Sequence, residues 1–294
     1  MAAVHSDIEG KEKEMIKFSF KATPTGVPII KDTMIDSCGE QIIREFCPEL
    51  LENPGQVPIE EIAESYFHLS LDYADLSQDG HIWGSVVFFD TDGKIVYSPE
   101  DEEAKEIAAK RGTIFIDNGL TWDERIRQRY STTAHECGHW LFHQLYWRRR
   151  AAESDKGAAV CDRDADISQN GRRALVTDKD WMEHQAGYFS GAILMPKTAF
   201  LLAAQDKGLR DAIDFKLKTE PEDERNWDLA WQMSRLFNVS REAAYVRIQE
   251  LGCSMGPGMS FEELRRKRME YLQLQKEIRD KKDARRKKPR VNQE

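Results

Sequence analysis

The stretch His135-Glu136-Cys137-Gly138-His139 has the pattern H-E-x-x-H. On an α-helix, residues four apart lie one above the other on one face, so His135 and His139 would present two neighbouring imidazoles. Two imidazoles at this spacing can bind one Zn²⁺, at about 2.0–2.1 Å each. Glu136 would then reach a water on the metal without binding the ion itself. Zinc lowers the pKa of such a water to about 7, and a carboxylate can take its proton as the water attacks a carbonyl. The motif therefore predicts metal-assisted hydrolysis of a peptide bond.

The residues on both sides of the motif favour a helix. Residues 130–134 and 140–146 bring apolar side chains at helical intervals, and Asp123 and Glu124 provide an acidic start. The alternative is a surface helix with two unrelated histidines. The amphipathic flanks favour the metal-binding helix over that alternative.

A second helix is expected over residues 181–195, where the pattern stops before a proline. Glu183 lies in its first turn, 44 residues after His139. A two-histidine site needs a third protein ligand, and a glutamate is one established solution, so Glu183 is the candidate. Gly187 and Gly191 are four residues apart and predict a smooth strip that packs closely against another helix.

Two other histidines compete with Glu183 as the third ligand. His143 continues the helical ladder, but it lies two turns from His135, about 12 Å along the axis, which is too far to share one ion. His184 follows Glu183 directly and points about 100° away from it on a helix.

Composition fits a globular protein of one large or two small domains. The chain has 294 residues, of which 40% are hydrophobic and 32% charged, with a net charge of −9. The acidic balance argues against general nucleic-acid affinity. Residues 262–294 are the exception, with 13 Lys/Arg against 7 Asp/Glu. This tail is either a solvated segment or an electrostatic handle for nucleic acid or an acidic partner.

The cysteines and the chain start favour a cytoplasmic protein. Five scattered cysteines without a C-x-x-C pair indicate reduced thiols rather than disulfides or a thiolate metal site. Residues 1–14 lack an apolar stretch that could target the chain for secretion. Apolar runs such as Val86–Phe89 are too short to span a membrane, so no membrane partner is expected.

Strands are expected between the N-terminal helices and the motif. Leu69–Tyr73 alternates in polarity, and Ile82–Asp90 and Lys94–Tyr97 flank the turn Thr91-Asp-Gly93, which predicts a hairpin. Gly112–Asp117 predicts a further strand just before the metal helix. An exposed edge there would let an extended peptide add as a strand, although an ordinary structural strand fits the sequence equally well.

Other segments are expected to be helices or loops. Asp32–Phe46, Ile59–Phe67, Glu102–Lys110 and Lys197–Lys218 have helical spacing. Residues 148–180 are polar and irregular and predict a loop near the cleft. Asp162, Asp164 and Asp166 alternate within it like calcium ligands, but a solvated acidic loop fits better, because the glycine and distal glutamate of a calcium loop are missing.

Several stretches resemble the motifs of the ImmA/IrrE family of metallopeptidases. They are His135–His143, Glu183–Phe189 and Leu194–Pro196, and the strand 112–117 and the hairpin beginning at Gly84-Ser-Val-Val-Phe also match the family's layout. The resemblance covers about residues 55–255. It implies zinc bound by His135, His139 and Glu183, with Glu136 as the general base. It also implies that the substrates are regulatory proteins, often DNA-binding repressors of mobile elements or stress genes.

The chain departs from the family pattern at Gln185 and Gly187, where many members have Glu and Asn. Neither is an expected ligand, so the departure bears on the surroundings of the metal. Cys137 points to the opposite side of the helix from His135, which favours core packing over a redox switch. Tyr188 is a candidate for the donor that stabilises the oxyanion. The ligand set also suits Mn²⁺ or Fe²⁺.

Residues 229–252 predict a helix, a turn at Asn238, and a second helix that Ser240 caps and Gly252 ends, which is helix-turn-helix spacing. DNA reading would use Arg241, Tyr245 and Arg247. Acidic residues dilute the charge of the second helix, and structural packing is favoured over DNA binding.

The expected fold is α+β, with a zincin-like core, a small twisted sheet, an active-site helix and a helical C-terminal lobe. The expected parts are a lead-in (1–55), a zinc metallopeptidase core (56–218), a helix-turn-helix-like lobe (219–256) and a basic tail (257–294). The expected function is cleavage of a repressor-type regulatory protein. The alternatives are a metal-stabilised module that binds DNA or protein without catalysis, and one half of a toxin–antitoxin pair. The sequence does not indicate an oligomeric state.

Overall fold

The computed structural model describes residues 16, 18–153, 160–164, 175–205 and 222–252. Helices and strands are both present, so the fold class is α+β, as predicted. The helices are α1 (Asp32–Phe46), α2 (Glu49–Glu52), α3 (Ile59–Glu61), α4 (Ile126–Phe142), α5 (Gln144–Glu153), α6 (Asp178–Leu194), α7 (Lys197–Gln205), α9 (Glu222–Leu236) and α10 (Arg241–Glu250). Short helical turns are η1 (Ile62–Tyr66), η2 (Asn118–Leu120) and η3 (Asp123–Arg125). The strands are β1 (Ser70–Ala74), β2 (Ile82–Val87), β3 (Thr91–Ser98), β4 (Glu103–Ala109), β5 (Thr113–Asp117) and β6 (Val160–Asp164).

The main sheet has four strands in the order β1-β5-β2-β6. β5 runs parallel to β1 and antiparallel to β2, and β6 pairs antiparallel with β2. All residues of β5 are buried, with Ile114 and Ile116 in the main core and Phe115 in the cluster on the opposite face, and β1 and β2 pair with its two edges. The strand expected at 112–117 is therefore confirmed. Of the two alternatives left open for it, an exposed edge and an ordinary structural strand, the structure shows the second. The outer strands of this sheet are β1 and β6.

The hairpin predicted between Ile82–Asp90 and Lys94–Tyr97 is wrong. β3 pairs with β4 in a separate two-stranded sheet, and the residues expected as the turn, Thr91–Gly93, already belong to β3. Glu102–Lys110, expected as a helix, contains the strand β4 instead. Its Ala, Glu and Lys residues have high helix propensity, but hydrogen bonding to β3 prevails over that weak local preference.

The loop predicted over residues 148–180 is wrong in part. Residues 148–153 continue helix α5, and residues 160–164 form β6 at the edge of the main sheet. Asp162 and Asp164 therefore belong to a strand, while Asp166 lies outside the described residues.

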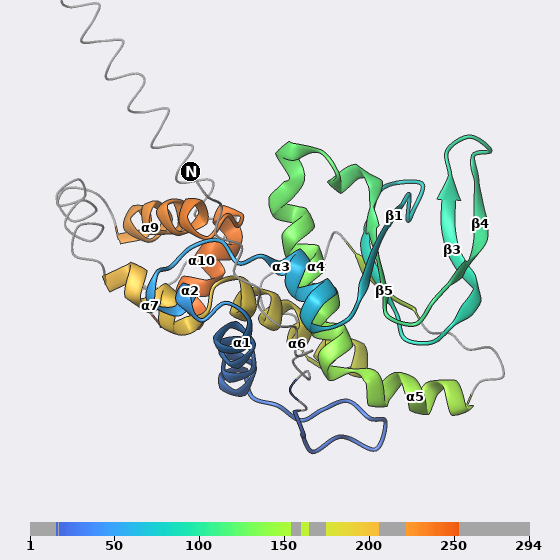
Figure 1. The fold of residues 1–294 in the computed structure, drawn as a ribbon, viewed down its shortest axis with the longest axis horizontal. Helices are drawn as coiled ribbons and strands as arrows, with labels where there is room; N and C mark the ends of the chain where they lie inside the picture. The colour runs from blue at the N-terminus through green and yellow to red at the C-terminus, as the bar shows by residue number, and fades with distance from the viewer. Residues whose placement is uncertain (1–15, 17, 154–159, 165–174, 206–221, 253–294) are drawn as a thin grey trace, which may run out of the picture.

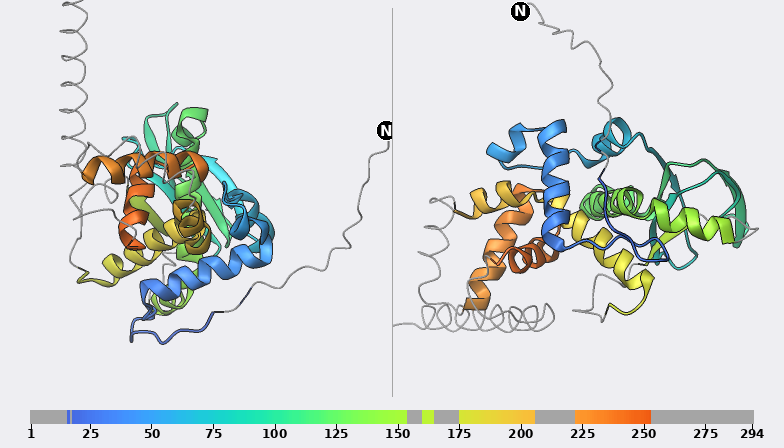
Figure 2. Two further views of the ribbon diagram at one scale, coloured as in Figure 1. Left: turned by 90° about the vertical axis from the view of Figure 1, so that its left-hand side faces the viewer. Right: turned by 90° about the horizontal axis from the view of Figure 1, so that it is seen from below.

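Helix α4 runs between the strands and a group of helices that includes α1, α9 and α10 (Figure 1 and Figure 2). On one side it packs against β2, and on the other against α6. The two-stranded sheet covers the opposite face of the main sheet, where Val87 and Phe115 join Val96 and Ala109 in a small apolar cluster. The main core joins α1, α4, α6 and the C-terminal helices. Helix α4 is thus held from both sides by the hydrophobic core.

Small residues set the spacing between the packed helices. A Cβ atom on Gly138 of α4 would lie 3.0 Å from the Cα atom of Ala186 on α6. A Cβ atom on Gly39 of α1 would lie 3.1 Å from the carbonyl oxygen of Ala192. The strip predicted at Gly187 and Gly191 does not serve this purpose, since open space surrounds Gly187 and only Gly191 approaches α10.

The C-terminal helix pair follows the sequence closely. The Ser240 side chain accepts a hydrogen bond from the Ala243 amide and caps α10. Asn238 takes a positive φ of 51° in the turn, and Gly252 takes 64° just after α10. The helix expected at 197–218 begins as α7, which ends at Gln205; the rest of that prediction and the basic tail lie outside the described residues.

Within the described ranges, every helix is too short or too polar to cross a membrane.

Candidate metal centre

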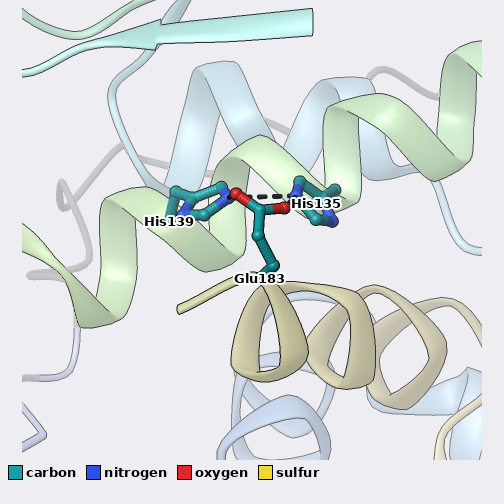
Figure 3. Close-up of side chains that lie close together, drawn as sticks. All are labelled: His135, His139 and Glu183. Carbon is teal, nitrogen blue, oxygen red and sulfur yellow. Dashed lines mark hydrogen bonds and ion pairs between the residues drawn. The ribbon is translucent and has the colours of Figure 1, made fainter. Parts of the chain in front are cut away.

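Helices α4 and α6 bring three of the predicted residues together (Figure 3). His135 and His139 lie one turn apart on α4, with their Nε2 atoms 3.0 Å from each other. Glu183 reaches across from α6, with Oε2 at 3.2 Å from His135 Nε2 and Oε1 at 3.4 Å from His139 Nε2. All three side chains are buried, with exposed fractions of 3%, 0% and 8% for the residues in chain order. Together they form a group that could bind a metal ion.

The spacing of these donor atoms fits a tetrahedral metal ion. Zinc bonds of about 2.0–2.1 Å in tetrahedral geometry separate neighbouring ligand atoms by about 3.3 Å. The two Nε2 atoms are 3.0 Å apart, Glu183 Oε2 lies 3.2 Å from that of His135 and Glu183 Oε1 lies 3.4 Å from that of His139, all close to that value. Two imidazoles and one carboxylate are a known zinc donor set. The residues present therefore fit the ion that the motif implies.

Local structure explains why Glu183 meets the two histidines. Thr177 caps α6 by accepting a hydrogen bond from the Asp180 amide, and the Asp180 carboxylate accepts from the Thr177 amide. This capping box starts the helix before the predicted first residue and places Glu183 in its second turn. The close approach at Gly138 then lets the Glu183 side chain reach α4.

The two imidazoles favour the ionised form of Glu183. Burial alone would raise the pKa of Glu183, but the imidazoles of His139 and His135 more than offset this effect and hold that pKa well below its usual range. Glu183 is therefore ionised, as a metal ligand must be.

Glu136 is completely buried between α4 and β2. Gly84 of β2 lies against it, since a Cβ atom on this glycine would be 3.1 Å from Glu136 Oε1 and would overlap Cγ2 of Thr132. Glycine is thus needed at this position for the strand to pass so close to the carboxylate. The sequence offered Gly84 only as part of a resemblance, and its contact with Glu136 follows from the tertiary fold.

His143 is not part of the metal group, as expected, but it contacts the group directly. Its Nδ1 lies 2.9 Å from His139 Nδ1, and its Nε2 lies 3.0 Å from Gln185 Oε1. Burial, with a smaller effect from His139, lowers the pKa of His143 well below its usual value. Sequence reasoning missed this role, although the four-residue spacing of His135, His139 and His143 was a signal that could have indicated it.

His184 and Tyr188 point away from the metal group. His184 Nε2 lies 2.9 Å from Asp32 Oδ1 on α1. The Tyr188 hydroxyl donates to Asp36 Oδ2 at 3.0 Å, inside the contact between α1 and α6. The guess that Tyr188 stabilises an oxyanion therefore loses its geometric basis. Cys137 is buried and free, as predicted, and burial raises the pKa of its thiol.

Two of the three residues considered for DNA reading are buried. Arg247 is 0% exposed and its Nη2 lies 2.6 Å from Asp36 Oδ1, while Tyr245 is 2% exposed. Arg241 lies with its guanidinium over the Trp227 ring. Arg247 and Tyr245 of α10 thus lie in the core, where they cannot contact DNA. This favours the interpretation that the helix pair serves structural packing.

No protein-family model matches the chain, and no curated protein matches it. Among solved structures, one match is a Mycobacterium tuberculosis transcriptional regulator, with 18% identity, 72% of this chain and 45% of that chain covered, and a TM-score of 0.35. The chain thus spans less than half the length of that protein. A TM-score at this level carries no argument about fold or function, so the resemblance to the ImmA/IrrE family stays a prediction.

Proposed function

We propose that the protein is a zinc-dependent endopeptidase. The observation that carries the proposal is the buried group of His135, His139 and Glu183, whose donor atoms are spaced 3.0 to 3.4 Å apart. Glu136 follows His135 directly on the same helix. This is the combination of ligands and adjacent carboxylate that hydrolysis by a zinc peptidase requires.

The ion would be held by His135, His139 and Glu183, with a further position open to water or substrate. When bound, it would supply Lewis acidity that polarises a carbonyl and lowers the pKa of water. The Glu136 carboxylate takes a proton from the attacking water and later delivers it to the leaving amine. Burial of Glu136 keeps other water away from that proton transfer. Mn²⁺ and Fe²⁺ suit the same ligands, and metal analysis distinguishes them.

The substrate class is proposed from the motif resemblance. We propose that the protein cleaves a regulatory protein, of the kind represented by DNA-binding repressors of mobile elements or stress genes. The zincin-like core and a cytoplasmic location belong to the same proposal. The alternative of a DNA-binding module is less well supported, because Arg247 and Tyr245 are buried in the helical lobe.

The test uses the full chain loaded with zinc, beside Glu136→Gln and Glu183→Ala. Each is incubated with a cell extract, and new protein N-termini are identified by mass spectrometry. We expect a restricted set of new termini with the wild type, none with either variant, and none after chelation. The Glu136→Gln protein should still bind zinc, because Glu136 is not a ligand. Equal cleavage by Glu136→Gln would rule out Glu136 as the base.

A further inference from the structure

A relay of buried hydrogen bonds leads from the Pro28 carbonyl through Gln185 and His143 to His139. Gln185 Nε2 donates to the Pro28 carbonyl oxygen at 2.8 Å. Gln185 Oε1 lies 3.0 Å from His143 Nε2, and His143 Nδ1 lies 2.9 Å from His139 Nδ1. His143 and His139 are 0% exposed and Gln185 is 2% exposed. These contacts connect three separate segments of the chain to one metal-facing ring.

The Pro28 carbonyl sets the direction of every hydrogen bond in this relay. A carbonyl oxygen only accepts, so the Gln185 amide must present its NH₂ group to Pro28 and its oxygen to His143. That oxygen also only accepts, so His143 Nε2 must carry a hydrogen. In a neutral imidazole the other nitrogen then holds a lone pair, so His143 Nδ1 accepts from His139 Nδ1–H.

The opposite direction would bring two acceptors together. If His143 carried its hydrogen on Nδ1, its Nε2 would accept and Gln185 would have to turn its NH₂ group toward it. The Gln185 oxygen would then face the Pro28 oxygen at hydrogen-bond distance with no hydrogen between them. A buried contact of this kind costs about 1–3 kcal/mol, so one direction is strongly preferred.

We propose that Gln185 and His143 are positioning residues that hold neutral His139 as the Nδ1–H tautomer, with the lone pair of Nε2 directed at the metal position. The inference rests on the metal site of the proposed function. A ligating histidine commonly donates its second ring N–H to a fixed acceptor, which orients the ring. Here that acceptor is a second imidazole, anchored through an amide to the backbone of another segment.

A neutral acceptor has a consequence for the charge of the site. A carboxylate in the place of His143 would add a negative charge beside Glu183, inside the core. The amide and imidazole orient His139 without that charge, so the ligands together carry only the single charge of Glu183. Loss of such a partner typically weakens metal binding about 10- to 100-fold.

The first test observes the hydrogens directly. The full chain, labelled with ¹⁵N in its histidines, is examined by NMR without metal and with zinc, and resonances are assigned by single substitutions. We expect His143 as the Nε2–H tautomer in both samples, and His139 with its hydrogen on Nδ1 in the zinc sample. A His143 ring with its hydrogen on Nδ1 would overturn the inference.

The second test measures metal affinity by competition with a chromophoric chelator for Zn²⁺ alone. Gln185→Leu removes both hydrogen bonds and should weaken zinc binding about 10- to 100-fold. Gln185→Glu keeps an acceptor for His143 Nε2–H but turns an oxygen toward the Pro28 carbonyl oxygen, so it should bind zinc more tightly than Gln185→Leu and more weakly than wild type. Ser190→Ala is the matched control, because Ser190 also joins α6 to α4, through the Ser131 carbonyl, but stands outside the relay. Its zinc affinity should not change.

The outcomes separate this inference from the proposed function. Equal zinc affinity of Gln185→Leu and wild type would overturn the relay while leaving the peptidase proposal intact. The expected tautomers and affinities without any cleavage would support the relay and contradict the peptidase. If Gln185→Leu does not fold, the tautomer of His143 in the wild-type protein decides the matter in either direction.

Discussion

The contact of Gly84 with helix α4 gives a prediction whose size follows from the structure. In Gly84→Ala, the new methyl group would overlap Cγ2 of Thr132 and lie 3.1 Å from Oε1 of Glu136. Carbon atoms in ordinary contact stand about 3.5–4.0 Å apart, so strand and helix must separate locally by about 1 Å. Overpacking of this kind costs about 1–3 kcal/mol, and we expect the upper end because Thr132 is fully buried.

The assay is urea unfolding of the full chain, followed by circular dichroism. Gly84→Ala should lose about 3 kcal/mol, and the double variant Gly84→Ala/Thr132→Ser should recover most of it, because serine lacks the overlapping methyl group but keeps the hydroxyl. Zinc-dependent cleavage should be low in Gly84→Ala and also in the double variant, since the added methyl group lies close to the Glu136 carboxylate in both. A Gly84→Ala protein as stable as wild type, or no recovery in the double variant, would refute this description of the contact.

Three further predictions concern the buried charges, the thiols and the metal. Arg247→Met should lower the free energy of unfolding by about 3–5 kcal/mol, because the Asp36 carboxylate stays buried without its guanidinium partner; a loss below about 1 kcal/mol by urea unfolding would contradict a buried pair. Burial raises the pKa of the Cys38 thiol to about 12 and that of the Cys47 thiol to about 11. Both thiols should therefore react with a thiol reagent at pH 8 only after unfolding, as measured by mass spectrometry of the labelled peptides. Rapid labelling of the folded protein would show that they are accessible. Adding zinc at about 100 times its dissociation constant should stabilise the metal-free protein by about 2.7 kcal/mol. The measurement is a rise in unfolding temperature that a chelator reverses. No rise would show that zinc does not bind the folded state.

Segments with a strong local pattern were predictable from the sequence. The apolar spacing of Asp32–Phe46, with Pro48 beyond it, fixed both ends of α1. Ser240 and Gly252 similarly marked the limits of α10. In these helices the residue that begins or ends the element lies within the element's own sequence, so local reasoning suffices.

Strand pairing was less predictable because it depends on distant residues. The turn-like Thr91-Asp-Gly93 suggested that β2 pairs with β3, whereas β2 pairs with β5 and β6. Glu103–Ala109 has a helical composition and still forms a strand against β3. Both errors have one cause: hydrogen bonds to a partner elsewhere in the chain override a weak local preference.

The candidate site shows the same division. The spacing of His135 and His139 within one helix is local and was predicted correctly as a pair facing the same way. Glu183 was chosen because it lies on a second expected helix and because a two-histidine site needs a third protein ligand. The roles of His143, Gln185 and Gly84 follow only from how α4, α6 and β2 pack together, and no local pattern states them.

The central claim is that His135, His139 and Glu183 bind one metal ion. Its most direct test is the metal content of the purified full chain, measured beside His139→Ala and Glu183→Ala. We expect about one zinc per wild-type chain and loss of that zinc in both variants, since each removes one of three protein ligands. Absence of metal from the wild-type protein, even after reconstitution with zinc, would contradict the claim and with it the proposed peptidase.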